Sequence, residues 1–141
     1  MLQYFARLVA VGVSVLSAAT GMTAQIRTIE NTEWRLQELN GRAIEVTDES
    51  QRPWLRLSGT DSTANGNTGC NSFSGGYAVR EDDGLSFGPM AATRRYCAET
   101  ADLEQEFLGI LASTMTFSLS GDRLELRGGS VEAVFLPADP D

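Results

Sequence analysis

The residues that could support chemistry in this chain are few. Ser72 and Ser74 are candidate nucleophiles, but the sequence contains no histidine and no lysine. A serine or cysteine nucleophile usually depends on one of these residues as its general base, and most zinc sites contain histidine. The composition therefore argues against triad hydrolases and against a zinc centre.

Carboxylates are the remaining candidates for acid–base work. They occur as pairs at Glu104 and Glu106 in a predicted helix and at Asp82 and Asp83 in a predicted turn. A glycosidase needs two carboxyl groups that face each other across a cleft, whereas we expect both pairs to be solvated. Calcium would need closely spaced oxygen ligands, and none of the acidic residues in the loops and turns has the D-x-[DN]-x-[DN]-G spacing of a calcium loop. These residues are Asp48, Glu49, Asp61, Asp82 and Asp83. We predict no catalytic residue, no metal and no cofactor.

The stretch from Gly66 to Tyr77 is rich in glycine and asparagine. It lacks the G-K-[ST] ending of a phosphate-binding loop and leads into a strand pattern instead of a helix. Glycine and asparagine both tolerate a positive φ. We interpret this stretch as a structural corner where the backbone turns sharply.

Two cysteines, Cys70 and Cys97, are the only ones in the chain. A lone pair in an oxidising compartment is most simply a disulfide. A redox pair would be expected as C-x-x-C, and a metal site would need more ligands. Closing this loop would stabilise the fold by about 3.5 kcal/mol on a chain-entropy estimate.

The first 24 residues have the layout of a secretory signal peptide. Arg7 is followed by an apolar run from Leu8 to Ala19, and small residues then offer cleavage after Ala19, Gly21 or Ala24. The run is too short for a transmembrane helix, so we expect no membrane span in the mature protein. No cysteine stands near these positions, which argues against a lipid anchor. We predict a periplasmic or secreted protein with a leader at 1–24, one domain at 25–136 and a loose tail at 137–141.

The charge balance narrows the choice of partners. Eleven basic residues, all of them arginine, face 19 acidic residues, for a net charge of −8. Nucleic acids and anionic membrane surfaces call for basic patches. We therefore expect the protein to bind neither nucleic acid nor an anionic membrane surface. The partner that we expect is a protein, of unknown identity, or a small hydrophobic ligand.

Apolar residues alternate with polar ones through most of the chain, which predicts short strands joined by turns. Asn40-Gly41 predicts a type I′ hairpin, and helical spacing with a cap at Thr100 predicts one helix over 100–112. The fold class is mainly β (α+β), a small antiparallel β-barrel or strongly curved sheet of about eight strands with one helix packed on it. The expected strands are 32–39, with a slip before Leu39, 43–46, 54–57, 62–65, 73–79, 85–87, 90–93, 114–119, 123–127 and 131–136.

Large side chains are expected to fill the core. If the barrel interior is not wholly filled, an apolar pocket is the alternative. Its lining would be Trp34, Trp54, Leu103 and Phe107.

Several motifs together resemble a known family. They are Gly69-Cys70-Asn71-x-Phe73-x-Gly75-x-Tyr77, Thr93-Arg94-x-x-Cys97 and Glu104-x-x-Phe107-Leu108-x-x-Leu111, with Trp34-x-Leu36, Asn40-Gly41 and Gly121-Asp122-x-Leu124-x-Leu126. From about Asn31 to Leu136 the chain resembles the META domain family, also called HslJ-like.

This resemblance implies a small antiparallel barrel with a packed helix and a pair between the motif cysteines, Cys70 and Cys97. Family members are often secreted or lipid-anchored, and some are linked to stress tolerance, motility or virulence. The fold is similar to that of a pilot lipoprotein that assists secretin assembly and holds acyl chains. No catalytic residues are established for the family. We predict an exported, non-enzymatic accessory or stress-related binding module; the alternative is a carrier that holds a lipid or acyl chain in the barrel.

Overall fold

The computed structural model describes residues 29–139, so the predicted leader lies outside the described residues. The described part contains the helix α2 (Ala101–Ser113), a short 3-10 helix η1 (Glu49–Gln51) and ten strands. The strands are β1 (Glu33–Leu39), β2 (Arg42–Ala43), β3 (Trp54–Ser58), β4 (Thr63–Asn67), β5 (Ser72–Arg80), β6 (Gly84–Phe87), β7 (Ala91–Ala92), β8 (Thr116–Ser120), β9 (Arg123–Gly128) and β10 (Val131–Pro137).

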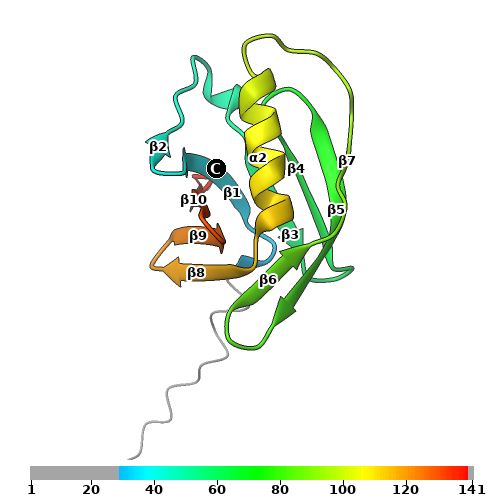
Figure 1. The fold of residues 1–141 in the computed structure, drawn as a ribbon, viewed down its shortest axis with the longest axis vertical. Coiled ribbons are helices and arrows are strands. Elements are labelled where there is room, and N and C mark those ends of the chain that lie inside the picture. Colours follow the sequence, from blue (N-terminus) through cyan, green and yellow to red (C-terminus); the bar gives the residue numbers. More distant parts are fainter. Residues whose placement is uncertain (1–28, 140–141) are drawn as a thin grey trace, which may run out of the picture.

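Eight of the strands close into an antiparallel barrel (Figure 1). Their order is β10-β9-β8-β6-β5-β4-β3-β1, and β1 pairs in turn with β10. Two short strands lie outside this ring, with β2 paired to β1 and β7 paired to β5. Closure removes exposed edges from the eight-stranded ring. The predicted fold class is confirmed.

The slip expected before Leu39 is a β-bulge. The register of β1 against β10 shifts between Leu36 and Glu38, which leaves Gln37 as the extra residue. Leu36 and Leu39 are both fully buried as a result, although they stand an odd number of positions apart.

The hairpin after β1 has the expected turn but a shorter second strand. Asn40 and Gly41 have φ values of 49° and 78°, as a type I′ turn requires. The strand predicted over 43–46 is only Arg42–Ala43, which corrects that prediction. The Ile44 amide still donates to the Gln37 carbonyl of β1 at 2.8 Å, but the carbonyls of Leu36 and Ile44 accept from the guanidinium of Arg52, so a side chain replaces the ladder beyond Ala43.

The helix α2 packs with its apolar face on the barrel interior, between the β1 and β10 side and the β5 side (Figure 1). Its Phe107 is fully buried, and its ring lies 5.7 Å from that of Phe73 and 6.1 Å from that of Phe135. The helix also covers the thinnest seam of the barrel, where β6 and β8 share one ladder pair, Gly84 with Thr116. The predicted helix is confirmed, and Thr100 stands at its N-cap position, but the Thr100 side chain makes no capping hydrogen bond, which corrects that part of the prediction.

The C-terminal strand runs slightly further than expected. Pro137, predicted to open a loose tail, is the last residue of β10 and pairs with Trp34, and the amide of Ala138 donates to the Glu33 carbonyl at 2.8 Å. Across residues 29–139, no helix has the length and apolar character needed to cross a membrane.

Candidate functional site

The glycine-rich corner is organised around the side chain of Asn71, which is only 2% exposed. Its Nδ2 donates to the Arg95 carbonyl and to Glu104 Oε1, each at 2.8 Å. Its Oδ1 accepts from Thr93 Oγ1 at 2.8 Å and from the Arg95 amide at 2.7 Å. These four bonds use both donors and both acceptor sites of the amide. One buried asparagine therefore ties the corner to α2 and to the segment before it.

Thr68 completes this network from the other side of the turn. The residue is fully buried, and its Oγ1 donates to Glu104 Oε1 at 2.8 Å and accepts from the Asn71 amide at 3.0 Å. The backbone closes the same turn, because the Thr68 amide donates to the Asn71 carbonyl at 2.8 Å. One carboxylate oxygen of Glu104 thus receives hydrogen bonds from two buried side chains.

The residues between these two partners make the turn itself. Gly69 has a φ of 95°, and a Cβ there would lie 2.6 Å from the Gln51 carbonyl oxygen, so both the backbone angle and the space demand glycine. Cys70 follows and forms a disulfide with Cys97, with the two Cα atoms 6.1 Å apart. The expected disulfide is confirmed.

Three other residues of the sequence motif have structural contacts along β5. Phe73 is buried in the core against Phe107. Gly75 leaves room for its neighbours, since a Cβ would lie 2.6 Å from both Met90 Sδ and the Pro89 carbonyl oxygen. The hydroxyl of Tyr77 lies 2.9 Å from Glu30 Oε1. Burial, followed by this hydrogen bond, raises the pKa of Tyr77 far above its usual range.

A second polar cluster holds η1 against the barrel. Arg52 forms a bidentate pair with Glu49, with both N···O distances at 2.7 Å. This hydrogen bonding lowers the pKa of Glu49 and raises that of Arg52. Together with its bonds to two carbonyls of the β1–β2 region, the pair fixes the loop that borders the corner.

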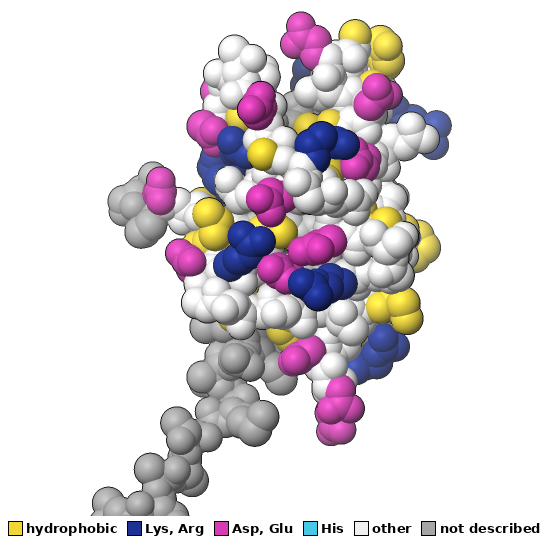
Figure 2. Space-filling view, turned by 60° about the vertical axis from the view of Figure 1, so that its left-hand side comes forward, with side chains coloured by type: hydrophobic (Ala, Val, Ile, Leu, Met, Phe, Trp, Pro, Cys, Tyr) yellow, Lys and Arg dark blue, Asp and Glu magenta, His cyan; other side chains and the backbone are white. Residues whose placement is uncertain are grey.

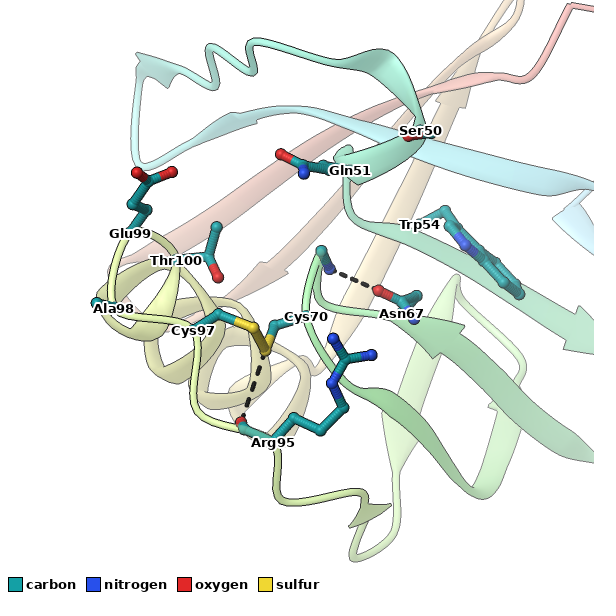
Figure 3. Close-up of a pocket in the computed structure, with 11 residues that line it drawn as sticks. Ser50, Gln51, Trp54, Asn67, Cys70, Arg95, Cys97, Ala98, Glu99 and Thr100 are labelled. Carbon is teal, nitrogen blue, oxygen red and sulfur yellow. Dashed lines mark hydrogen bonds between the residues drawn. A yellow bond between two sulfur atoms is a disulfide. The ribbon is translucent and has the colours of Figure 1, made fainter.

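A polar pocket of about 600 Å³ lies between η1, the corner and the N-terminus of α2 (Figure 3). The Arg95 side chain reaches toward it beside the disulfide, and Asn67 borders it with Oδ1 bound to the Gly69 amide at 2.7 Å. Its lining consists of Ser50, Gln51, Trp54, Asn67, Gly69, Cys70, Arg95, Cys97, Ala98, Glu99 and Thr100.

Of the four residues expected around an apolar pocket, three lie in or against the packed core and one lies elsewhere. Trp34 and Phe107 are buried in the core, and Leu103 is half-buried and packed against it. Trp54 lies outside that cluster and borders the polar pocket at the corner. The Trp34 indole donates to the Ile29 carbonyl at 2.8 Å, so its polar atom is satisfied inside the fold.

The carboxylates expected to be solvated have different positions. Glu104 is bound by Thr68 and Asn71, which corrects the expectation for that residue. Glu106 forms a surface ion pair with Arg42 at 2.6 Å. Asp82 and Asp83 lie in an exposed turn with positive φ. Among residues 29–139, no three Cys, Asp or Glu side chains gather closely enough to hold a metal ion.

Sequence reasoning missed Thr68 and Glu104 as partners of Asn71. Glu104 stands 33 positions from Asn71 in the chain, so no local pattern links them. The available signal was Thr68 beside a glycine turn and an acidic residue in the first turn of the helix. That signal predicts caps and dipole interactions, and it does not predict a tertiary hydrogen bond.

Comparisons with known proteins agree with this architecture. The META domain family model matches residues 27–140. An NMR structure of a protein from Burkholderia xenovorans is 24% identical, with a TM-score of 0.66 over 99% of this chain and 100% of that one. A second NMR structure is 20% identical, with a TM-score of 0.65 over 80% and 94%. The crystal structure of a DUF4847 family protein from Bacteroides vulgatus is 12% identical, with a TM-score of 0.62 over 82% and 98%. These structures share the fold alone. No curated protein matches the sequence.

Proposed function

The chain belongs to the META domain family, and on that premise we propose that it is an exported, non-enzymatic accessory protein that presents a binding surface to a protein partner. The observation that supports this most is the saturated amide of Asn71. Its four hydrogen bonds all go to groups of the same corner. The chemistry of the motif is thus used to build a rigid scaffold.

The disulfide supports the exported part of the proposal. Such bonds persist in oxidising compartments and are rare in the reducing cytosol. Cys70 and Cys97 join the corner to the segment before α2, so reduction would loosen the same region that Asn71 holds. A protein that depends on this link is suited to the periplasm or the extracellular space.

The alternative function, a carrier of an acyl chain, has less support. Trp34 and Phe107, two of the residues proposed to line its cavity, are 2% and 0% exposed and pack within the core. A ligand between them would have to displace aromatic rings that are already in contact with their neighbours. Packed interiors resist added volume.

The test is the intact mass of the protein purified from its native envelope, under native, non-reducing conditions. We expect an N-terminus near Gln25, a mass reduced by two hydrogens and no bound hydrophobic material. Free thiols or a retained leader would contradict export, and co-purified lipid would favour the carrier. Turnover of a panel of periplasmic substrates that survives repurification would overturn the non-enzymatic assignment.

A further inference from the structure

Most arginines of the described chain are neutralised by glutamates. One face of the molecule shows this mixture of basic and acidic side chains directly (Figure 2). The paired arginines are Arg35, Arg42, Arg52, Arg56, Arg123 and Arg127. Within residues 29–139, Arg80, Arg94 and Arg95 take part in no salt bridge. Arg94 and Arg95 are adjacent in the chain, but the Arg95 side chain reaches toward the polar pocket at the corner (Figure 3). Arg94 is therefore the unpaired cation that borders the surface beside α2.

The segment that contains them, 93–99, connects β7 to α2 and arches over the end of the helix (Figure 1). Its backbone is held at three points. The Thr93 amide donates to the Ser72 carbonyl at 3.0 Å. The Asn71 side chain binds both the amide and the carbonyl of Arg95, and Cys97 forms the disulfide with Cys70. Between these anchors, Tyr96 is 84% exposed. A fixed backbone that displays arginine and tyrosine loses little conformational entropy when it binds a partner.

A groove lies directly beside this segment. Two adjoining pockets, of about 510 and 450 Å³, run between α2 and the stretch from Phe87 to Tyr96 and share Met90 and Leu108. The apolar lining continues through Ala92 and Ala112, while Arg94 and Tyr96 border one end. Glu104 also borders that end, and its Oε1 already accepts hydrogen bonds from Thr68 and Asn71. We call this surface, from Phe87 to Tyr96 and across to Leu108 and Ala112, the Arg94 groove.

We propose that the Arg94 groove binds an acidic, partly apolar peptide segment of a partner protein. A carboxylate of this segment would pair with Arg94, and an apolar side chain would lie over Met90 and Leu108. This inference rests on the proposed function, since it specifies the surface and the partner class of that accessory role. Among the motif residues, Arg94 has no hydrogen bond or ion pair in the described structure, unlike Thr93 and Cys97.

Charge complementarity selects this occupant. The chain has a net charge of −8, which opposes a long polyanion such as a nucleic acid, because that ligand needs a row of basic side chains. A short peptide has to place only one or two carboxylates beside Arg94. A carboxylate can form a bidentate pair with a guanidinium, which adds directional specificity to the charge attraction. Tyrosine and arginine are also, with tryptophan, enriched at the energetic centres of protein interfaces.

The experiment uses the full chain with its disulfide intact and a fluorescein-labelled peptide of alternating Glu and Leu, followed by fluorescence anisotropy. We expect saturable binding that weakens at about 0.5 M ionic strength and no comparable binding of a Lys–Leu peptide. Arg94→Glu is expected to weaken binding by about tenfold or more, because it replaces attraction with repulsion. Tyr96→Ala should also weaken it. Both side chains are exposed, so we expect neither substitution to impair folding, and a thermal melt checks this.

Arg80→Glu is the matched control, since Arg80 is also exposed and unpaired but lies on β5, outside the groove. It should change affinity by less than about twofold. The absence of saturable binding, equal losses from Arg80→Glu and Arg94→Glu, or equal binding of the Lys–Leu peptide would each overturn the proposal. None of these outcomes alters the mature mass or the absence of turnover, so this inference and the proposed function fail separately.

Discussion

The barrel core and the glycine-rich corner both contain buried side chains, but those side chains are held in place by different forces. Phe107 and Phe135 are fully buried among other apolar side chains, and their contacts depend on volume and shape. Thr68 and Asn71 are 0% and 2% exposed, yet they are polar and depend on partners at fixed positions. In the core a lost side chain leaves a cavity, whereas in the corner it leaves an unpaired polar group.

Because of this difference, the core mainly stabilises the fold, whereas the corner specifies how particular segments are placed on it. Core residues can be exchanged for others of similar volume at modest cost. The corner requires an amide at position 71, because Glu104 and the Arg95 backbone present one acceptor each to its NH₂ group and the Arg95 amide presents a donor to its oxygen. The corner therefore determines where α2 and the segment 93–99 lie on the barrel.

The largest effect is expected in the core. Phe107→Ala should lower the free energy of unfolding by about 3 to 5 kcal/mol, since it removes a fully buried ring that contacts Phe73 and Phe135. Urea denaturation monitored by circular dichroism measures this. Leu108→Ala on the same helix is the control, because Leu108 is only half-buried and should cost much less. Equal losses would mean that α2 is not anchored through Phe107.

The disulfide should be the strongest single element of the corner. Removing the bond between Cys70 and Cys97, which are 27 positions apart, should cost about 3.5 kcal/mol on the chain-entropy estimate. Cys70→Ser alone and the double variant with Cys97→Ser should unfold at nearly the same denaturant concentration. If the two single substitutions add, the cysteines do not act as one bond.

The hydrogen-bond network of the corner should contribute slightly less. Asn71→Leu keeps the volume but leaves Glu104 and Thr93 without their partner, which is expected to cost about 1 to 3 kcal/mol. A double-mutant cycle with Thr93→Val measures the coupling between the two residues. We expect the second substitution to cost little once Asn71 is gone. Full additivity would show that the bond from Thr93 to Asn71 does not stabilise the fold.

The sequence predicts the barrel better than the corner. Alternation and turn residues indicate most of the strands, and Asn40-Gly41 indicates the first hairpin, because these signals connect neighbours in the chain. The shortened β2 was not predictable in this way. Beyond Ala43 the Ile44 carbonyl accepts from the guanidinium of Arg52, which also binds the Leu36 carbonyl from 16 positions away, and side-chain contacts of this kind leave no periodic pattern.

Contacts between residues far apart in the chain were even harder to predict at the candidate site. Cys70 and Cys97 could be paired from their number and the expected compartment alone. Nothing in the order of residues shows that Thr93 turns inward to Asn71 while its neighbour Arg94 stays unpaired at the edge of the groove. Glu104 was expected in solvent because charged residues are rarely buried. It binds two side chains of the corner because the barrel places that corner against the first turns of α2.

The smallest effect tests a close approach between two backbone segments that flank the corner. Gly75→Val should lower stability by about 1 to 2 kcal/mol, because its Cβ would lie 2.6 Å from the Pro89 carbonyl oxygen, which has little freedom to move. Gly76→Val is the matched control on the same strand. Its Cβ would have only the Ser62 carbonyl oxygen nearby, at 3.9 Å, and valine favours extended backbone, so we expect no loss. Thermal unfolding followed by circular dichroism compares them. If both variants melt alike, the approach of Pro89 and Met90 to β5 does not require glycine, and the segment leading to the Arg94 groove is less tightly fixed than the corner that it joins.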